Sequence, residues 1–135
     1  MSLVVDPHPE ARARVAARRE GVERLLELGR VLPAGDRALI EQVFRRGATS
    51  AEIARLTGVP PYRMQRRRRL ILGRLRHPLY AFAIDHMELI PYSARGTVKL
   101  VLFHGMSLRG AARRRGKTLH EVRSHMHTLA VLAHR

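Results

Sequence analysis

The strongest constraint on the fold of this chain is an internal repeat, in which one residue pattern occurs twice without a gap. The matched residues are 58 positions apart: Leu32 and Ile90, Pro33 and Pro91, Arg37 and Arg95, Val43 and Val101, Gly47 and Gly105, Ala54 and Ala112, Gly58 and Gly116, and Met64 and Val122. Each copy places a small alanine where two helices can touch and, four residues later, a glycine suited to a left-handed turn. An apolar residue six positions further on can pin a second helix to the first. The repeat therefore predicts one helix-turn-helix unit used twice.

Apolar side chains elsewhere also recur at helical spacing, and no segment alternates as a strand would. We therefore expect an all-α fold of two tandem helix-turn-helix modules joined by a helical connector. Residues 1–77 would hold an N-terminal helix and the first module, residues 78–90 the connecting helix, and residues 91–135 the second module. Residues 79–87 are too apolar for a flexible linker, so a packed connector would restrict the relative orientation of the modules.

Local signals in the first copy make the expectation more specific. The N-terminal helix carries Gly21, a position where it can bend or split. Residues 49–52 form a capping box that starts the first helix of the motif. We expect Ile53, Ala54 and Leu56 in that helix to be buried.

Basic residues greatly outnumber acidic ones, because 26 Lys and Arg stand against 11 Asp and Glu, a formal net charge of +15. Phosphate is the abundant polyanion that neutralises such a charge, so we expect double-stranded DNA as the partner, with a membrane surface as the weaker alternative. No apolar run approaches the roughly 18 residues that span a bilayer, and residues 1–10 lack the apolar core of a signal peptide. We expect no membrane insertion and a cytoplasmic location, in a bacterium or a phage-infected host.

The sequence offers little for catalysis or cofactor binding. It contains no cysteine, which excludes disulfides, a cysteine nucleophile and the usual zinc fingers. No Ser-His-Asp order, phosphate-cradling glycine loop or convergent carboxylate pair is apparent. Three histidines, His120, His127 and His134, share one helix face, but zinc usually takes ligands one turn apart. We therefore expect no enzyme activity, no cofactor and no metal site.

The second helix of the first copy carries a dense run of arginines, and no carboxylate lies between Glu52 and Asp85 to neutralise it. A solvated basic face is the alternative explanation, but the place of the run on the second helix of the motif favours DNA contact. Arginine can pair with guanine and glutamine with adenine, so this helix can read sequence. The side chains expected to point away from the core and read bases are Tyr62, Arg63, Gln65, Arg66 and Arg69, and in the second copy Thr118, His120, Arg123, Ser124 and His127.

Other residues are suited to the DNA backbone. Hydroxyls and free N–H groups at helix starts can hold a phosphate, and nearby arginines can add charge. Ordinary N-capping is the other role of such hydroxyls, and both roles are compatible. The candidates for phosphate contact are Thr49, Ser50, Arg67 and Arg74 in the first copy, and Ser107, Arg109, Arg113, Arg114 and Arg115 in the second.

Both copies resemble the fourth region of the sigma-70 family, a helix-turn-helix that reads the upstream promoter element. The resemblance rests on residues 32–37, 47–54 and 57–59 of the first copy and on 105–107 and 121–127 of the second. It implies that Gln65 and Arg66, and likewise Arg123 and Ser124, take base-reading positions. The chain has no room for the aromatic-rich second region with which sigma factors melt a promoter.

Occupancy of DNA is the simplest output left, since no ligand domain, catalytic site or promoter-melting module is apparent. We interpret the chain as a monomeric, sequence-specific transcriptional regulator, a repressor similar in layout to the compact repressors of temperate phages. One alternative is a sigma-like accessory factor that binds RNA polymerase with one module and DNA with the other. Another is the DNA-binding subunit of a recombinase or transposase.

Overall fold

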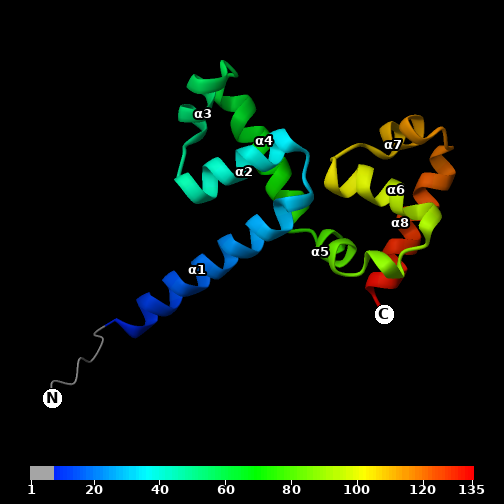
Figure 1. Cartoon of the computed structure of the whole chain (residues 1–135), viewed down its shortest axis with the longest axis horizontal. Coiled ribbons are helices and arrows are strands. Elements are labelled where there is room, and N and C mark those ends of the chain that lie inside the picture. The colour runs from blue at the N-terminus through cyan, green and yellow to red at the C-terminus, as the bar shows by residue number, and fades with distance from the viewer. Residues whose placement is uncertain (1–7) are drawn as a thin grey trace.

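The computed structural model describes residues 8–135, which form eight α-helices and no strand, as the sequence predicts (Figure 1). The first half holds α1 (Pro9–Leu28), α2 (Ala34–Arg46), α3 (Ser50–Thr57) and α4 (Pro61–Leu75). The second half holds α5 (Pro78–Asp85), α6 (Tyr92–Val98), α7 (Leu108–Arg115) and α8 (Leu119–Ala133). Two 3-10 turns, η1 (Gly29–Val31) and η2 (Met87–Leu89), and one π-helical turn, η3 (Lys99–Phe103), complete the chain. In Figure 1, α1 projects away from the remaining helices.

The two halves repeat the same local structure at the offset of the sequence repeat. Helices α7 and α8 begin and end 58 positions after α3 and α4. The side chains of Thr49 and Ser107 cap α3 and α7, each accepting a hydrogen bond from the N–H three residues on. Gly58 and Gly116 then end these helices with φ of 74° and 63°, a left-handed conformation that favours glycine.

The halves differ in the helix that precedes each pair. Helix α2 is regular over 13 residues, whereas α6 gives way to the π-helical turn after Val98. Residues 92–103 are therefore helical throughout, but the helix changes from α to π after Val98.

One hydrophobic core runs through both halves. It extends from Leu28 at the end of α1, through Ile40 of α2 and Ile71 of α4, to Leu129 of α8. The connector α5 lies inside this core, since Tyr80 and Ala83 are fully buried. A smaller cluster of Ala111, Ala112 and Val122 holds α7 against α8. The connector is thus packed, and the packing fixes the orientation of the two halves.

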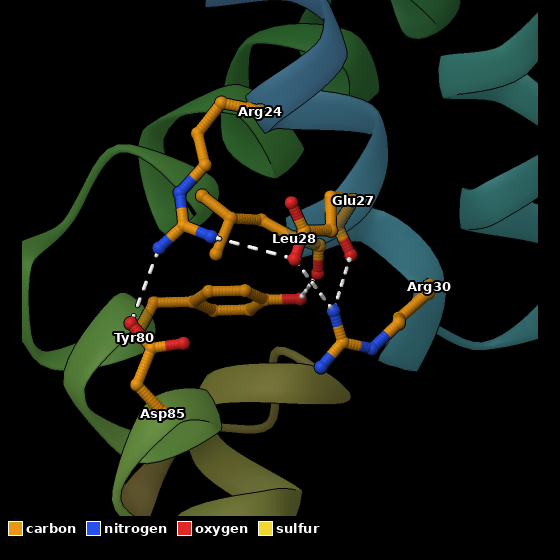
Figure 2. A network of polar contacts seen from close by, with 6 residues as sticks. All are labelled: Arg24, Glu27, Leu28, Arg30, Tyr80 and Asp85. Atoms are coloured by element: carbon orange, nitrogen blue, oxygen red, sulfur yellow. Dashed lines mark hydrogen bonds and ion pairs between the residues drawn. The ribbon is translucent and has the colours of Figure 1, made fainter.

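Tyr80 is the main link between the connector and its neighbours (Figure 2). Its hydroxyl donates a hydrogen bond to the Leu28 carbonyl over 2.7 Å. Its ring meets that of Phe103 edge-on, with 5.2 Å between centroids and 68° between planes. Arg24 of α1 reaches over to Asp85, at the end of α5, across 3.2 Å. These contacts join α1, α5 and η3.

Two local expectations need correction. Helix α1 is continuous through Gly21, so the glycine does not split it. Leu56, expected to be buried, is 85% exposed. It lies two residues after the buried Ala54, a rotation of about 200° that takes it to the opposite side of α3. Across residues 8–135, no helix is both long and apolar enough to cross a membrane.

Candidate nucleic-acid interface

Helix α4 exposes every base-reading candidate of the first copy. Met64, Ile71 and Leu75 bury one side of the helix against the core. The exposed side chains are Tyr62, Arg63, Gln65, Arg66 and Arg69. Within residues 8–135, Arg63, Arg66 and Arg69 have no ion pair or side-chain hydrogen bond. They can contact a ligand without breaking an internal interaction.

Arg67 and Arg74, which the sequence analysis assigns to phosphate, are both held by Asp36 of α2. Arg67 Nε and Nη2 lie 3.1 and 2.8 Å from Asp36 Oδ1, and Arg74 Nη2 lies 3.2 Å from Oδ2. The side chains of Asp36 and Arg74 are only 16% and 22% exposed, so solvent screens this pair weakly. Arg74 Nη2 also donates to the Phe103 carbonyl over 3.3 Å. Arg74 therefore makes its hydrogen bonds within the protein, whereas the side chain of Arg67 is about half exposed to solvent.

The sequence contains a signal for this division of the arginines. Arg67 and Arg74 each follow a buried residue, Met64 or Ile71, by three positions, so they share the core-facing side of α4. Arg63, Arg66 and Arg69 do not follow Met64 or Ile71 by three positions. Spacing from the core separates the two sets, but only the fold identifies Asp36 as the partner.

Helix α8 presents the second set in the same way. Val122 and Leu129 are buried, while the exposed side chains are Thr118, His120, Arg123, Ser124 and His127. This face carries one exposed arginine where α4 carries three. The Thr118 hydroxyl accepts a hydrogen bond from the Glu121 N–H over 3.1 Å and lies 3.2 Å from the Glu121 carboxylate. It therefore already caps α8.

The hydroxyls at the starts of α3 and α7 act as N-caps. Thr49 accepts from the Glu52 N–H over 3.1 Å and donates to its carboxylate over 3.2 Å, which is the predicted capping box. Ser107 accepts from the Gly110 N–H over 3.0 Å. Thr49 and Ser107 are exposed, but Ser50 is only 8% exposed and turns its side chain into the protein. Ser50 can therefore offer little of its hydroxyl to a phosphate.

Helix α7 gathers cationic side chains at one groove. Arg109, Arg113 and Arg114 are exposed, as contact with phosphate requires. Arg109 and Arg113 line a groove between α7 and the start of α8 together with Lys117. Lys117 was not singled out by the sequence pattern, and its place in the turn after Gly116 brings it to the groove. The groove thus concentrates three cations.

Arg115, another candidate for phosphate, points inward. Its Nη1 donates to the Thr97 hydroxyl over 2.6 Å and to the Ser93 carbonyl over 3.0 Å. Gly96 leaves room, since a Cβ there would come within 2.9 Å of the guanidinium. The Thr97 hydroxyl lies 2.7 Å from His125 Nδ1. Arg115 can only donate, so the Thr97 hydroxyl is the acceptor of the hydrogen bond between them. Burial, and then the Arg115 charge, lower the pKa of His125.

Among the described residues, no three His, Cys, Asp or Glu side chains are placed to hold a metal ion. Comparison of the chain with protein-family models, with curated proteins and with solved structures finds no match. Its function is therefore inferred from the chemistry of its own surface.

Proposed function

We propose that this chain is a sequence-specific double-stranded DNA-binding protein in which α3–α4 and α7–α8 are two helix-turn-helix modules. One observation carries the proposal: two equivalent helices, α4 and α8, bury one side and expose on the other the side chains that can pair with bases. A helix fits the major groove of B-form DNA, where arginine, glutamine and serine reach base edges. The net charge of +15 supplies attraction to the phosphate backbone.

In this arrangement the first helix of each module holds the DNA backbone and the second reads sequence. Thr49 and Ser107 at the starts of α3 and α7 are exposed, and the first N–H groups of a helix lack intrahelical acceptors, so these helix starts suit a phosphate. The groove lined by Arg109, Arg113 and Lys117 adds positive charge at α7. Arg63 and Arg66 on α4 are suited to guanine and Gln65 to adenine, because these side chains form paired hydrogen bonds with those bases.

The output that we infer is occupancy of DNA, so the protein acts as a transcriptional regulator and specifically as a repressor. A repressor binds its target without RNA polymerase, whereas a sigma-like accessory factor co-purifies with polymerase. A recombinase or transposase subunit binds the ends of a mobile element. Binding to promoter fragments in the absence of polymerase therefore distinguishes the repressor, and co-purification with polymerase separates the two alternatives from each other.

The test of base reading compares Gln65→Ala and Arg66→Ala with Arg45→Ala, which removes an exposed arginine from α2. Each α4 substitution should relax base preference at particular positions and cost about 1 to 3 kcal/mol on the preferred site. The Arg45→Ala protein should keep the base preference of the unmodified chain. If neither α4 variant changes the preference profile, α4 does not read bases.

A further inference from the structure

The hydrogen bond that Arg74 makes between the two halves joins positions that are not equivalent in the repeat. Arg74, near the end of α4, donates to the Phe103 carbonyl at the end of η3. Gly105 permits this approach, because a Cβ there would overlap the Arg74 guanidinium. In the repeat, Arg74 corresponds to Leu132 and Phe103 corresponds to Arg45.

A two-fold arrangement would require the reciprocal contact, because in such an interface residue i contacts j and j contacts i. The reciprocal partners here are Leu132 and Arg45. Leu132 packs against the common core, whereas Arg45 is exposed and lines a surface depression with Glu23 and Glu41. The two halves therefore meet head to tail.

The directions of the helices agree with a head-to-tail arrangement of the two halves. In Figure 1, α2 and α6 both run from right to left, and α4 and α8 both run downward. The α3–α4 turn lies at the top of the first half, and the α7–α8 turn lies at the upper right of the second half. In this view the second half is displaced to the right and turned, so that α4 slants to the right and α8 to the left as they descend, but a half-turn in the plane of the view would have reversed both helices.

Buried contacts hold this arrangement. Arg74 Nη2 donates both to Asp36 Oδ2 and to the Phe103 carbonyl, and both contacts are partly buried. The Tyr80 hydroxyl donates to the Leu28 carbonyl at the end of α1 (Figure 2). The Tyr80 ring meets the ring of Phe103 edge-on. A fixed orientation of the halves means a fixed direction and separation of α4 and α8.

We propose that the two modules bind one duplex in the same direction, so that the target is a direct, head-to-tail repeat of two different half-sites. This rests on the proposed function. The N-terminal residues of a recognition helix contact the bases, so each module reads its half-site with a defined polarity. Two modules whose recognition helices keep the same sense of direction read half-sites of equal polarity, whereas two-fold dimers read palindromes. Arg74 is a positioning residue, which sets the distance between the half-sites from inside the protein.

The first experiment inverts one half-site and uses the unmodified chain. The duplex is the sequence enriched from a random DNA pool, with its half-sites located by hydroxyl-radical footprinting, and a second duplex carries the α8 half-site inverted in place. We expect inversion to weaken binding at least about ten-fold, because the second module loses its effective-concentration gain. Equal or tighter binding after inversion, or protection of a single half-site, overturns the direct repeat but leaves DNA binding intact. Absence of any sequence-specific binding removes the proposed function itself.

The second experiment locates both modules on the DNA directly. The chain has no cysteine, so Arg46→Cys and His104→Cys each create one attachment point for an iron chelate that cleaves nearby DNA. The two positions are exposed and equivalent in the repeat. We expect both chelates to cut on the same side of their half-sites, read along one strand. Mirror-image displacement of the cuts overturns the proposal.

The third experiment tests Arg74 with a matched control. Arg74→Met removes the charge that spans Asp36 and Phe103, and Arg76→Met removes an exposed charge from the end of α4. For the unmodified chain, lengthening the spacer by about two base pairs should reduce affinity, since the half-sites rotate relative to each other. This spacer penalty should be smaller in Arg74→Met than in the unmodified chain, because the core and Tyr80 still hold the halves, and it should persist in full in Arg76→Met. If Arg74→Met folds, as judged by circular dichroism, and keeps the full penalty, Arg74 does not position the modules.

Discussion

Replacing Tyr80 by phenylalanine should destabilise the protein at neutral pH and stabilise it at strongly alkaline pH. The side chain is fully buried, and its hydroxyl donates to the Leu28 carbonyl over 2.7 Å. Carbonyls at the end of a helix lack their usual intrahelical partners, so loss of this hydrogen bond should cost about 1 to 2 kcal/mol. The phenylalanine ring would keep its edge-on contact with Phe103.

The alkaline effect follows from the ionisation of the hydroxyl. Burial raises the pKa of Tyr80 to about 12, although the charges of Arg74 and Arg30 act in the opposite direction. In the unfolded chain the pKa is about 10, so ionisation favours unfolding. The stability due to this difference is fully present below pH 10 and is lost as the pH rises toward 12. The loss reaches about 1.4 kcal/mol by about pH 11, where the stability curves of the two proteins should cross.

Urea unfolding followed by circular dichroism at several pH values between 7 and 12 measures this difference. Tyr92→Phe is the matched control, because Tyr92 is 86% exposed and the change should stay within about 0.5 kcal/mol at every pH. A free-energy difference between Tyr80→Phe and the unmodified chain that is constant with pH would show that ionisation of Tyr80 is not the cause. So would an equal crossing in Tyr92→Phe.

Three further predictions concern other parts of the molecule. If the protein contacts about 6 to 10 phosphates, a plot of the logarithm of DNA affinity against the logarithm of salt concentration should fall with a slope of several units. A slope near zero in a salt titration would contradict this prediction. The pKa of His125 is lowered in the folded protein, so its contribution to stability is fully present above about pH 6.5 and is lost as the pH falls below that value. The stability of His125→Gln, measured by urea unfolding, should therefore depend less on pH. Gly58→Ala should destabilise the fold by about 1 to 2 kcal/mol, because φ is 74° at this position. Gly73→Ala, inside α4 and facing open space, should stabilise the fold by about 0.5 to 1 kcal/mol. Thermal unfolding measures both effects, and equal effects would contradict this prediction.

Much of the helical layout could be predicted because short-range chemistry specifies it. Gly58 and Gly116 take the left-handed turns that the repeat predicts, and Thr49 caps α3 as its spacing to Glu52 predicts. Pro78 begins the connector where the sequence predicts a break. Each of these features depends on residues no more than a few positions apart.

Long-range pairing could not be predicted in the same way. Asp36 lies 31 and 38 positions from Arg67 and Arg74, and a run of arginines does not show which of them a distant carboxylate will hold. Leu56 shows a related difficulty, because an apolar side chain on a short helix is buried only on the side that meets a neighbour. The inward turn of Arg115 depends on Gly96 and Thr97 in another helix.

We propose that one chain reads one asymmetric site with two different helices. Selection of bound sequences from a random DNA pool, combined with measurement of the mass of the complex by analytical ultracentrifugation, tests it most directly. We predict enrichment of a composite, non-palindromic sequence whose half-sites lie about one helical turn apart, with one chain bound to each duplex. Enrichment of a palindrome bound by two chains, or no enrichment of any sequence, would contradict the account.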